Sequence, residues 1–406
     1  MIRMSEWKEC TLRQVIQIKH GFAFSGKYFS NTGSHIVLTP GNFYEEGGFK
    51  EKGDKEKWYT GPIPVGYVLN QGDLIIAMTE QAEGLLGSSA IIPQNGLYLH
   101  NQRLGLVSIL DTQKTDKKFI YYLFNIKSVR QQIRASATGV KIRHTAPSRV
   151  LDVKVKIPSL LRQRRIADTL STYDDFIENC QRRIKILEEM ARNLYREWFV
   201  RFRFPGYEKI KMVNSPLGEI PEGWEVKTLD SLVFFQKGRK SAETHDIALL
   251  DDVKLLLIDS LYGNDVKYVS PEKLILAAFQ DTIMVMDGAS SCNVTIGAEG
   301  AVGSTLGRFR TMQPDIFSSY ALYYFLDSKA EDFKTKNIGS AIPHANKDYI
   351  LRQLIAFPPQ RITSQFDKII DPIQREIRTI KIRIQILRRT RDLLLLRLMS
   401  GEIDVQ

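Results

Sequence analysis

Two stretches of this chain carry the same long pattern of apolar residues, and this repeat limits the possible folds more than any other feature. In each stretch apolar side chains recur at alternating spacings of four and three residues, the pattern of a helix that packs along another helix. The first copy comprises Ile166, Leu170, Tyr173, Ile177, Cys180, Ile184, Leu187, Ala191, Leu194 and Trp198. The second copy, 200 residues later, comprises Phe366, Ile370, Ile373, Ile377, Ile380, Ile384, Leu387, Arg391, Leu394 and Leu398. Nine of the ten later positions are apolar, so we interpret the pattern as an internal repeat of two long helices.

Each helix must bury its apolar stripe, and the other copy offers the matching stripe. We predict an antiparallel intramolecular coiled coil, because a whole domain separates the two copies. An unbroken helix from Ile166 to Trp198 would be roughly 50 Å long. The motif at residues 371–374, Asp-Pro-Ile-Gln, resembles a helix start with a cap and a capping-box partner. It predicts a short helix followed by a longer one of roughly 40 Å. The alternative is that both are core helices of one globular domain.

The repeat extends beyond the helices. Residues 7–12 match 224–229, residues 73–78 resemble 281–286, residues 121–123 resemble 323–325, and Gly139 and His144 align with Gly339 and His344. The offset drifts from 217 to 200, as insertions and deletions in loops would produce between two copies of one fold. We therefore predict a domain at 1–157, a spacer helix at 158–204, a linker at 205–222, a second domain at 223–357 and a second spacer helix at 358–406.

Each predicted domain combines short strands with one amphipathic helix. In the first, β-type runs occur at 36–38, 73–78, 104–110 and 150–157, bounded by turn-forming residues. Apolar spacing predicts a helix over 117–134 there, and one around 320–333 in the second domain. The fold class is therefore α+β: two repeated, mostly-β domains separated by a pair of long helices.

Composition indicates an intracellular protein with a polyanionic partner. The net charge is +11 and the isoelectric point is near 9.3, which favours binding to a polyanion. The three cysteines are far apart, so we expect neither a disulfide framework nor a zinc site. No apolar run reaches the length of a membrane span, and the first residues do not resemble a signal peptide. We expect a cytoplasmic protein without a membrane partner.

No catalytic signature emerges from the sequence. It has no P-loop, no Asn-Pro-Pro-aromatic motif of amino-methyltransferases and no metal-ligand spacing of Cys and His. The glycine-rich residues 297–303 have the wrong spacing for a dinucleotide fingerprint and are more typical of a turn. Asp73 and Asp281 begin strands, where an acid is typical of a turn. We expect no catalytic residue, metal or cofactor on this chain.

Both domains instead carry loops that mix cations, amides, hydroxyls and aromatics. Arg and Lys read guanine edges, Asn and Gln read adenine edges, and Lys and Ser hold phosphates. Such residues also form ordinary solvated loops, and a structural role for His144 and His344 is equally compatible with the pattern. The candidate DNA contacts are Lys19, Lys27, Tyr28, Gln81, Gln102, Arg103, Lys141, Arg143 and His144 in the first domain, and Lys237, Arg239, Lys240, Ser290, Asn293, Lys336, His344, Asn346 and Lys347 in the second.

Over essentially its whole length the chain resembles the specificity subunit of type I restriction–modification systems. Residues 220–229, Ile-Pro-Glu-Gly-Trp-Glu-Val-Lys-Thr-Leu, are similar to the start of a target-recognition domain in that family. The Pro-x-x-x-x-Gln-x-x-Ile passage at 158–166 and the ending at 398–403 resemble the entry to the spacer helix and the family's usual finish. The chain departs from the pattern at Arg162, where an acid is common, and in the second passage at 358–362.

The resemblance implies a role in addressing DNA rather than in catalysis. Each domain would read one half of a bipartite, asymmetric site on double-stranded DNA, and the helices would set the spacing, which is comparable with about 34–36 Å per DNA turn. Modification subunits using S-adenosylmethionine and a restriction/translocase subunit using ATP and Mg²⁺ would be the partners. Two alternatives are a single-chain methyltransferase or nuclease fragment, and a basic scaffold that binds proteins or RNA.

Overall fold

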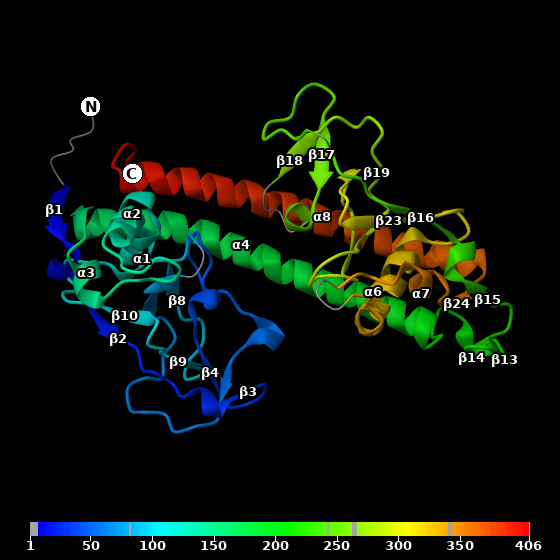
Figure 1. The fold of residues 1–406 in the computed structure, drawn as a ribbon, viewed down its shortest axis with the longest axis horizontal. Coiled ribbons are helices and arrows are strands. Elements are labelled where there is room, and N and C mark those ends of the chain that lie inside the picture. The colour runs from blue at the N-terminus through cyan, green and yellow to red at the C-terminus, as the bar shows by residue number, and fades with distance from the viewer. Residues whose placement is uncertain (1–6, 81–82, 242, 262–265, 340–342, 406) are drawn as a thin grey trace. The chain divides into compact units, whose positions relative to one another are not determined.

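The computed structural model describes residues 7–80, 83–241, 243–261, 266–339 and 343–405. The chain divides into two compact units. Unit 1 comprises residues 1–177 and 387–406, and unit 2 comprises residues 178–386. Two long helices, α4 (Leu160–Tyr195) and α8 (Gln360–Met399), each contribute one part to each unit (Figure 1).

Unit 1 is built on two four-stranded sheets. One has the order β2-β10-β6-β8, the other β3-β5-β4-β9, and β1 pairs with β12 and β7 with β11. The strands are β1 (Lys8–Thr11), β2 (Ile16–His20), β3 (Phe29–Ser30), β4 (His35–Val37), β5 (Trp58–Tyr59), β6 (Leu74–Ala77), β7 (Thr79–Glu80), β8 (Ser89–Ile91), β9 (Tyr98–Leu99), β10 (Leu104–Ile109), β11 (Arg143–His144) and β12 (Lys154–Ile157). The shorter helices are α1 (Lys117–Asn125), α2 (Lys127–Ala135) and α3 (Pro147–Leu151).

Unit 2 repeats this plan. Its sheet orders are β16-β23-β20-β21 and β18-β17-β22-β19, and β15 pairs with β24 as β1 does with β12. The strands are β13 (Met212–Ser215), β14 (Gly218–Pro221), β15 (Glu225–Thr228), β16 (Val233–Lys237), β17 (Val253–Leu256), β18 (Lys267–Val269), β19 (Leu276–Ala277), β20 (Thr282–Val285), β21 (Val294–Ile296), β22 (Gly300–Val302), β23 (Leu306–Thr311) and β24 (Leu354–Phe357). Its shorter helices are α5 (Ile258–Leu261), α6 (Ser319–Thr335) and α7 (Lys347–Leu351).

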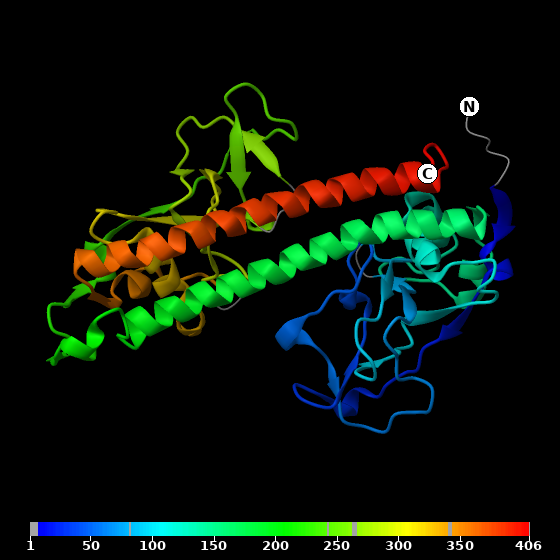
Figure 2. The same ribbon diagram turned by 180° about the vertical axis from the view of Figure 1, so that it is seen from behind.

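The two long helices pair in antiparallel fashion, as predicted. In unit 1, Ile166 and Leu170 near the start of α4 share a hydrophobic core with Leu398 near the end of α8. In unit 2, Trp198 just beyond α4 shares a core with Phe366 near the start of α8. Within each unit, the start of one helix therefore meets the end of the other, and in both views the paired parts lie side by side (Figures 1 and 2). All the predicted seam positions are buried or half-buried.

The prediction that Pro372 starts a new helix is wrong, since α8 runs through it without a break. Asp371 does not cap a helix but accepts hydrogen bonds from Tyr320 and from Arg375. Gln374 donates to the hydroxyl of Tyr324. Proline in a helix interior costs about 3 kcal/mol. Here Pro372 is exposed, and the side chains around it are anchored in unit 2, so packing outweighs that cost.

Two other local predictions need correction, and the predicted linker has a local structure of its own. Only the second half of the predicted strand at 150–157 is extended, because Pro147 begins a short helix that ends at Leu151. The predicted helix at 117–134 is broken at Ile126, which is extended, where the Asn125 side chain turns to bond Ser89. The predicted linker at 205–222 contains the hairpin β13–β14, in which Gly218 has a φ of 90°.

The Gln of the Pro-x-x-x-x-Gln passage has a structural role. Gln163 is fully buried, and its amide donates to the carbonyl oxygens of Pro158 and Lys114 at 2.8 and 2.9 Å. Its own oxygen accepts from the backbone N–H of Asp116 at 2.9 Å. Asp116 in turn caps α1 by accepting from the N–H of Phe119. Gln163 thus joins the start of α4 to the start of α1.

Candidate nucleic-acid interface

In unit 1 several of the predicted contact residues meet at one end of the sheet β2-β10-β6-β8. These strands are antiparallel, so the end of β2, the start of β10 and the end of β6 lie at the same edge. The Met78 N–H donates to the Arg103 carbonyl, and the Thr145 N–H donates to the Met78 carbonyl, both at 2.9 Å. We call this edge 1; its candidate residues are Lys19, Gln102, Arg103, Lys141, Arg143 and His144.

A tight hairpin carries three of the edge 1 residues. Thr138 and His144 exchange backbone hydrogen bonds of 2.9 and 2.8 Å, which close the loop between them. Gly139 has a φ of 98°, and a Cβ there would lie 2.0 Å from the carbonyl oxygen of Ile142, so only glycine fits. The hairpin leaves Lys141 exposed at its tip.

Edge 2 is the equivalent place in unit 2, at the end of β16, the start of β23 and the end of β20. Its residues are Lys237, Arg239, Asp287 and His344. The Met286 N–H donates to Thr305 and the Ala345 N–H donates to Met286, both at 2.8 Å, which repeats the links of edge 1. Gly238 and Gly21 occupy the same place, since a Cβ on either would lie about 2 Å from a carbonyl oxygen of the neighbouring chain segment.

One difference in charge between the two edges lies two residues after β6 and β20. In edge 2, Asp287 contacts Nδ1 of His344 at 2.7 Å and Nζ of Lys237 at 3.1 Å. Burial alone would raise the pKa of Asp287, but hydrogen bonds from His344 and Lys237 outweigh burial and hold that pKa below its ordinary value. In edge 1 the position is Thr79, whose hydroxyl lies 3.2 Å from Nδ1 of His144. Asp287 was not among the predicted contact residues, although an acid two residues after the strand that aligns with β6 was a usable signal.

Other predicted contact residues are not brought to the edges. Lys27 and Tyr28 lie on a turn beside the sheet β3-β5-β4-β9, where the Lys27 ammonium is 4.7 Å from the Tyr28 ring centroid. Asn346 caps α7 by accepting from the Tyr349 N–H at 3.0 Å, so its side-chain oxygen has a structural role. Gln81 lies outside the described residues.

Arg239 of edge 2 and the remaining candidates in unit 2 have mixed surroundings. Arg239 donates to the Lys273 carbonyl at 2.9 Å. The Lys347 ammonium lies 5.5 Å from the Phe235 ring centroid. Ser290 and Asn293 are half-buried in the turn after β20, and Lys240 and Lys336 are exposed. As DNA contacts, these residues stay predictions.

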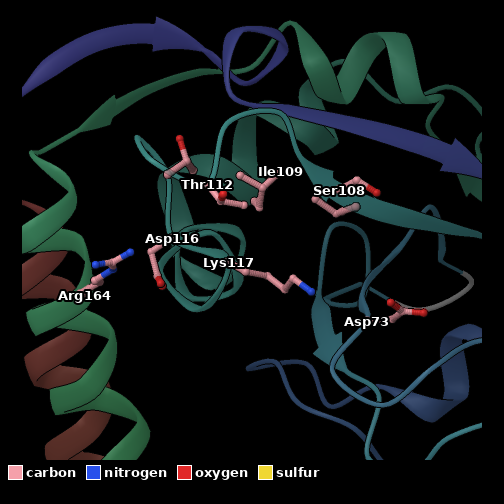
Figure 3. Close-up of a pocket in the computed structure, with 9 residues that line it drawn as sticks. Asp73, Ser108, Ile109, Thr112, Asp116, Lys117 and Arg164 are labelled. Atoms are coloured by element: carbon pink, nitrogen blue, oxygen red, sulfur yellow. The ribbon is translucent and has the colours of Figure 1, made fainter.

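A pocket of about 420 Å³ in unit 1 contains two carboxylates with defined structural tasks. Figure 3 shows Asp73 and Asp116 among its lining residues. Asp73 accepts from the Asn70 N–H at 2.8 Å, and its counterpart Asp281 accepts from the Ala278 N–H, so both form turns as predicted. Asp116 is the cap of α1. Both carboxylates of this pocket therefore have a structural role.

The described part of the chain offers neither a metal-binding cluster nor a membrane span. Its His, Cys, Asp and Glu residues form no group of three that could hold a metal ion. No helix in the same residues is long and apolar enough to cross a membrane.

The sequence is similar to curated specificity subunits. It is 24% identical over 314 residues to the type I restriction enzyme MjaIX specificity subunit of Methanocaldococcus jannaschii, covering 74% of this chain and 72% of that protein. It is 22% identical over 243 residues to the EcoBI specificity subunit of Escherichia coli, covering 57% of this chain. That second match spans 47% of the relative, less than half of its length.

The fold is also found in a solved structure. The crystal structure of a type I restriction-modification system S subunit from M. genitalium aligns with 97% of this chain and 96% of its own, with a TM-score of 0.61 and 18% identity. The family model described as the type I restriction modification DNA specificity domain matches residues 4–189 and 221–388, one match for each repeat. The chain therefore belongs to the type I restriction–modification DNA specificity family.

Proposed function

We propose that edge 1 and edge 2 each read one half of a bipartite, asymmetric DNA site. The observation that carries this proposal is that the same sheet edge is built twice and furnished with different side chains. The shared glycines, Gly21 and Gly238, keep the backbone path the same. The acid at 287 and the hydroxyl at 79 present different hydrogen-bonding groups, so the two half-sites should differ in sequence.

The long helices would set the spacing and hold the modification subunits. Within unit 2, the outward surfaces of α4 and α8 expose apolar side chains that the helix pair does not bury, at Ile186, Met190, Ile382 and Ile386. Within unit 1, Phe176, Leu393 and Leu396 are exposed in the same way. Exposed apolar residues grouped on one element are typical of a protein interface.

The chemistry would reside on the partner subunits. Modification subunits would bind S-adenosylmethionine and methylate adenine, and a restriction/translocase subunit would bind ATP and Mg²⁺. This chain would supply the address and would act in the cytoplasm, where the host DNA is.

The decisive experiment is modified-base sequencing of host DNA after co-expression of this chain with its modification subunits. A bipartite motif with a fixed gap and adenine methylation in both halves supports the proposal. An assembled complex that methylates no such motif contradicts it.

The role of edge 1 can then be tested on its own. We expect Lys141→Ala with Arg143→Ala to weaken binding or to relax one half of the motif, because both side chains lie on the hairpin. Lys156→Ala is a matched control, since this exposed lysine of β12 pairs with Glu9 on β1, away from edge 1. Unchanged affinity and an unchanged motif in the hairpin variant would remove the hairpin from the interface.

A further inference from the structure

Arg308 on β23 is a buried cation without a carboxylate partner in the described residues. The residue is 9% exposed. Its guanidinium donates to the Leu276 carbonyl and to the Gln236 side-chain oxygen, both neutral groups. Its Nε is buried and has no hydrogen-bond partner among the described atoms. A buried charge without a counter-charge is unfavourable unless a ligand supplies one.

Arg308 lines a pocket of about 400 Å³ in unit 2. The other lining residues are Gln236, Leu274, Ile275, Leu276, Ala277, Ala278 and Arg310. Arg310 is already neutralised, because Asp281 accepts two hydrogen bonds from it at 2.7 and 2.6 Å. The pocket therefore keeps one excess positive charge, which suits an anion.

The repeat shows that this charge has a counterpart in unit 1. Gln236 pairs with Arg308 across β16 and β23, and the aligned residues Lys19 and Leu106 pair across β2 and β10. Each pair contains one cation and one neutral residue. In unit 2 the cation is on β23, whereas in unit 1 it is on β2, the strand that aligns with β16. Lys19 donates to the Gly66 carbonyl at 2.6 Å and lies 4.2 Å from the Tyr67 ring centroid. If residue 308 only had to pack against its neighbours, leucine would be sufficient, because leucine occupies the aligned position 106 in unit 1.

The pocket lies one residue away from edge 2 along β16 and β23, on the face of the sheet opposite to the Lys237 side chain. Lys237 follows Gln236 directly and pairs with Gly307, the neighbour of Arg308. An anion that DNA presents beside a base-reading edge is a backbone phosphate. We propose that the pocket at Arg308 seats one phosphodiester of the bound DNA, so that Arg308 is the unit 2 counterpart of Lys19. This inference rests on the proposed function.

The test uses the full chain with its modification subunits and a duplex that carries the methylated motif. We expect Arg308→Leu to weaken binding roughly tenfold and to reduce the slope of log affinity against log salt by about 1. The variant Gln236→Lys with Arg308→Leu recreates the arrangement of unit 1 and should restore both values. Arg201→Leu, which removes an exposed arginine of unit 2 paired with Glu197, should change neither.

The outcomes separate this inference from the function on which it rests. If the unmodified complex does not bind the duplex, the proposed function fails. If it binds, and Arg308→Leu keeps its affinity and salt slope, the phosphate assignment is overturned. A rise in melting temperature with inorganic phosphate over chloride at equal ionic strength, together with unchanged DNA binding by Arg308→Leu, would show a site for free phosphate only and would also overturn it. Should Arg308→Leu not fold, Arg308→Gln gives the same comparison.

Discussion

Units 1 and 2 make the same contact between a domain and the helix pair with different chemistry. In unit 1, the Tyr122 hydroxyl donates to Asp174 of α4 at 2.6 Å, and Arg391 of α8 pairs with the same carboxylate at 2.7 Å. In unit 2, the aligned tyrosine, Tyr324, accepts from Gln374. The position aligned with Arg391 is Ala191, which is fully buried.

At this contact between domain and helices, which we call the tyrosine layer, unit 1 has a carboxylate and a cation that pair with each other, and unit 2 has neither at the aligned positions. Asp174 stands on one helix and Arg391 on the other, so Asp174 has this cation beside it only when the two helices are correctly paired, whereas Arg391 also pairs with Asp392 of its own helix at 2.8 Å. Removing one member of a buried ion pair leaves the other uncompensated, whereas removing both can be nearly neutral. At the aligned positions unit 2 has the uncharged residues Gln374 and Ala191. Substitutions that copy these residues into unit 1 can therefore test the tyrosine layer.

The largest effect should come from disrupting the seam that both units share. We expect Ile184→Asp with Ile384→Asp to destabilise the chain by about 4 kcal/mol or more, because two carboxylates would enter an apolar seam. Ile184 is half-buried and Ile384 is 8% exposed. Urea unfolding followed by circular dichroism measures the change.

A matched control lies two residues further along each helix. Ile186 and Ile386 are 51% and 61% exposed, so Ile186→Asp with Ile386→Asp adds the same charge outside the seam. This control should change stability by less than about 1 kcal/mol. Equal unfolding midpoints for the two double variants would mean that the seam does not hold the helices together. The control pair should instead impair docking of the modification subunits.

The next largest effect should come from the Asp174–Arg391 ion pair of the tyrosine layer. Arg391→Ala should cost about 2–3 kcal/mol, because it leaves the partly buried Asp174 without its cation; the figure is reduced from the fully buried case for solvent screening. Asp174→Gln with Arg391→Ala copies unit 2 and should recover most of the loss. Thermal unfolding of the two variants and the unmodified chain measures both changes. A double variant no more stable than Arg391→Ala alone would show that the ion pair contributes more than mutual neutralisation.

The seam and the repeat were predictable because each depends on residue type and spacing alone. A ten-position pattern at one fixed offset identifies two equivalent helices, whatever the loops between them do. The break at Pro372 was predicted wrongly because the capping signal is local, while the contacts of Asp371 and Gln374 with Tyr320 and Tyr324 are tertiary. Arg391 was visible as the one seam position that is not apolar, but its partner Asp174 was not.

The candidate site was predictable only in part. Lys19, Arg143 and Lys237 could be proposed from composition and from their place in repeated loops. Arg308 could not be proposed in this way, because it lies within a strand and its role becomes evident only from the strand register. Only the pairing of Gln236 with Arg308, and of Lys19 with Leu106, shows that the cation has changed strands between the units.

The smallest effect is a pH dependence that unit 2 should have and unit 1 should lack. Burial, helped by the nearby Asp371 carboxylate, raises the pKa of Asp367 to about 6 despite a hydrogen bond from Ser318. The aligned residue in unit 1 is Ala167. A raised pKa means that the folded chain holds a proton that the unfolded chain releases near pH 3.8. The stabilisation is therefore complete below that pH and is lost as the pH rises through about 6.

Because the Asp367 side chain is only half-buried, we expect a change of about 1 kcal/mol over this window. Other carboxylates titrate in the same range, so the informative quantity is the difference in free energy of unfolding between the unmodified chain and Asp367→Asn, measured at several pH values. That difference should change across the window and stay constant above about pH 7. A difference that is flat from acid to neutral pH would show that Asp367 ionises as freely in the folded chain as in the unfolded one. The two units would then respond alike to pH at this position, although one carries an acid and the other an alanine.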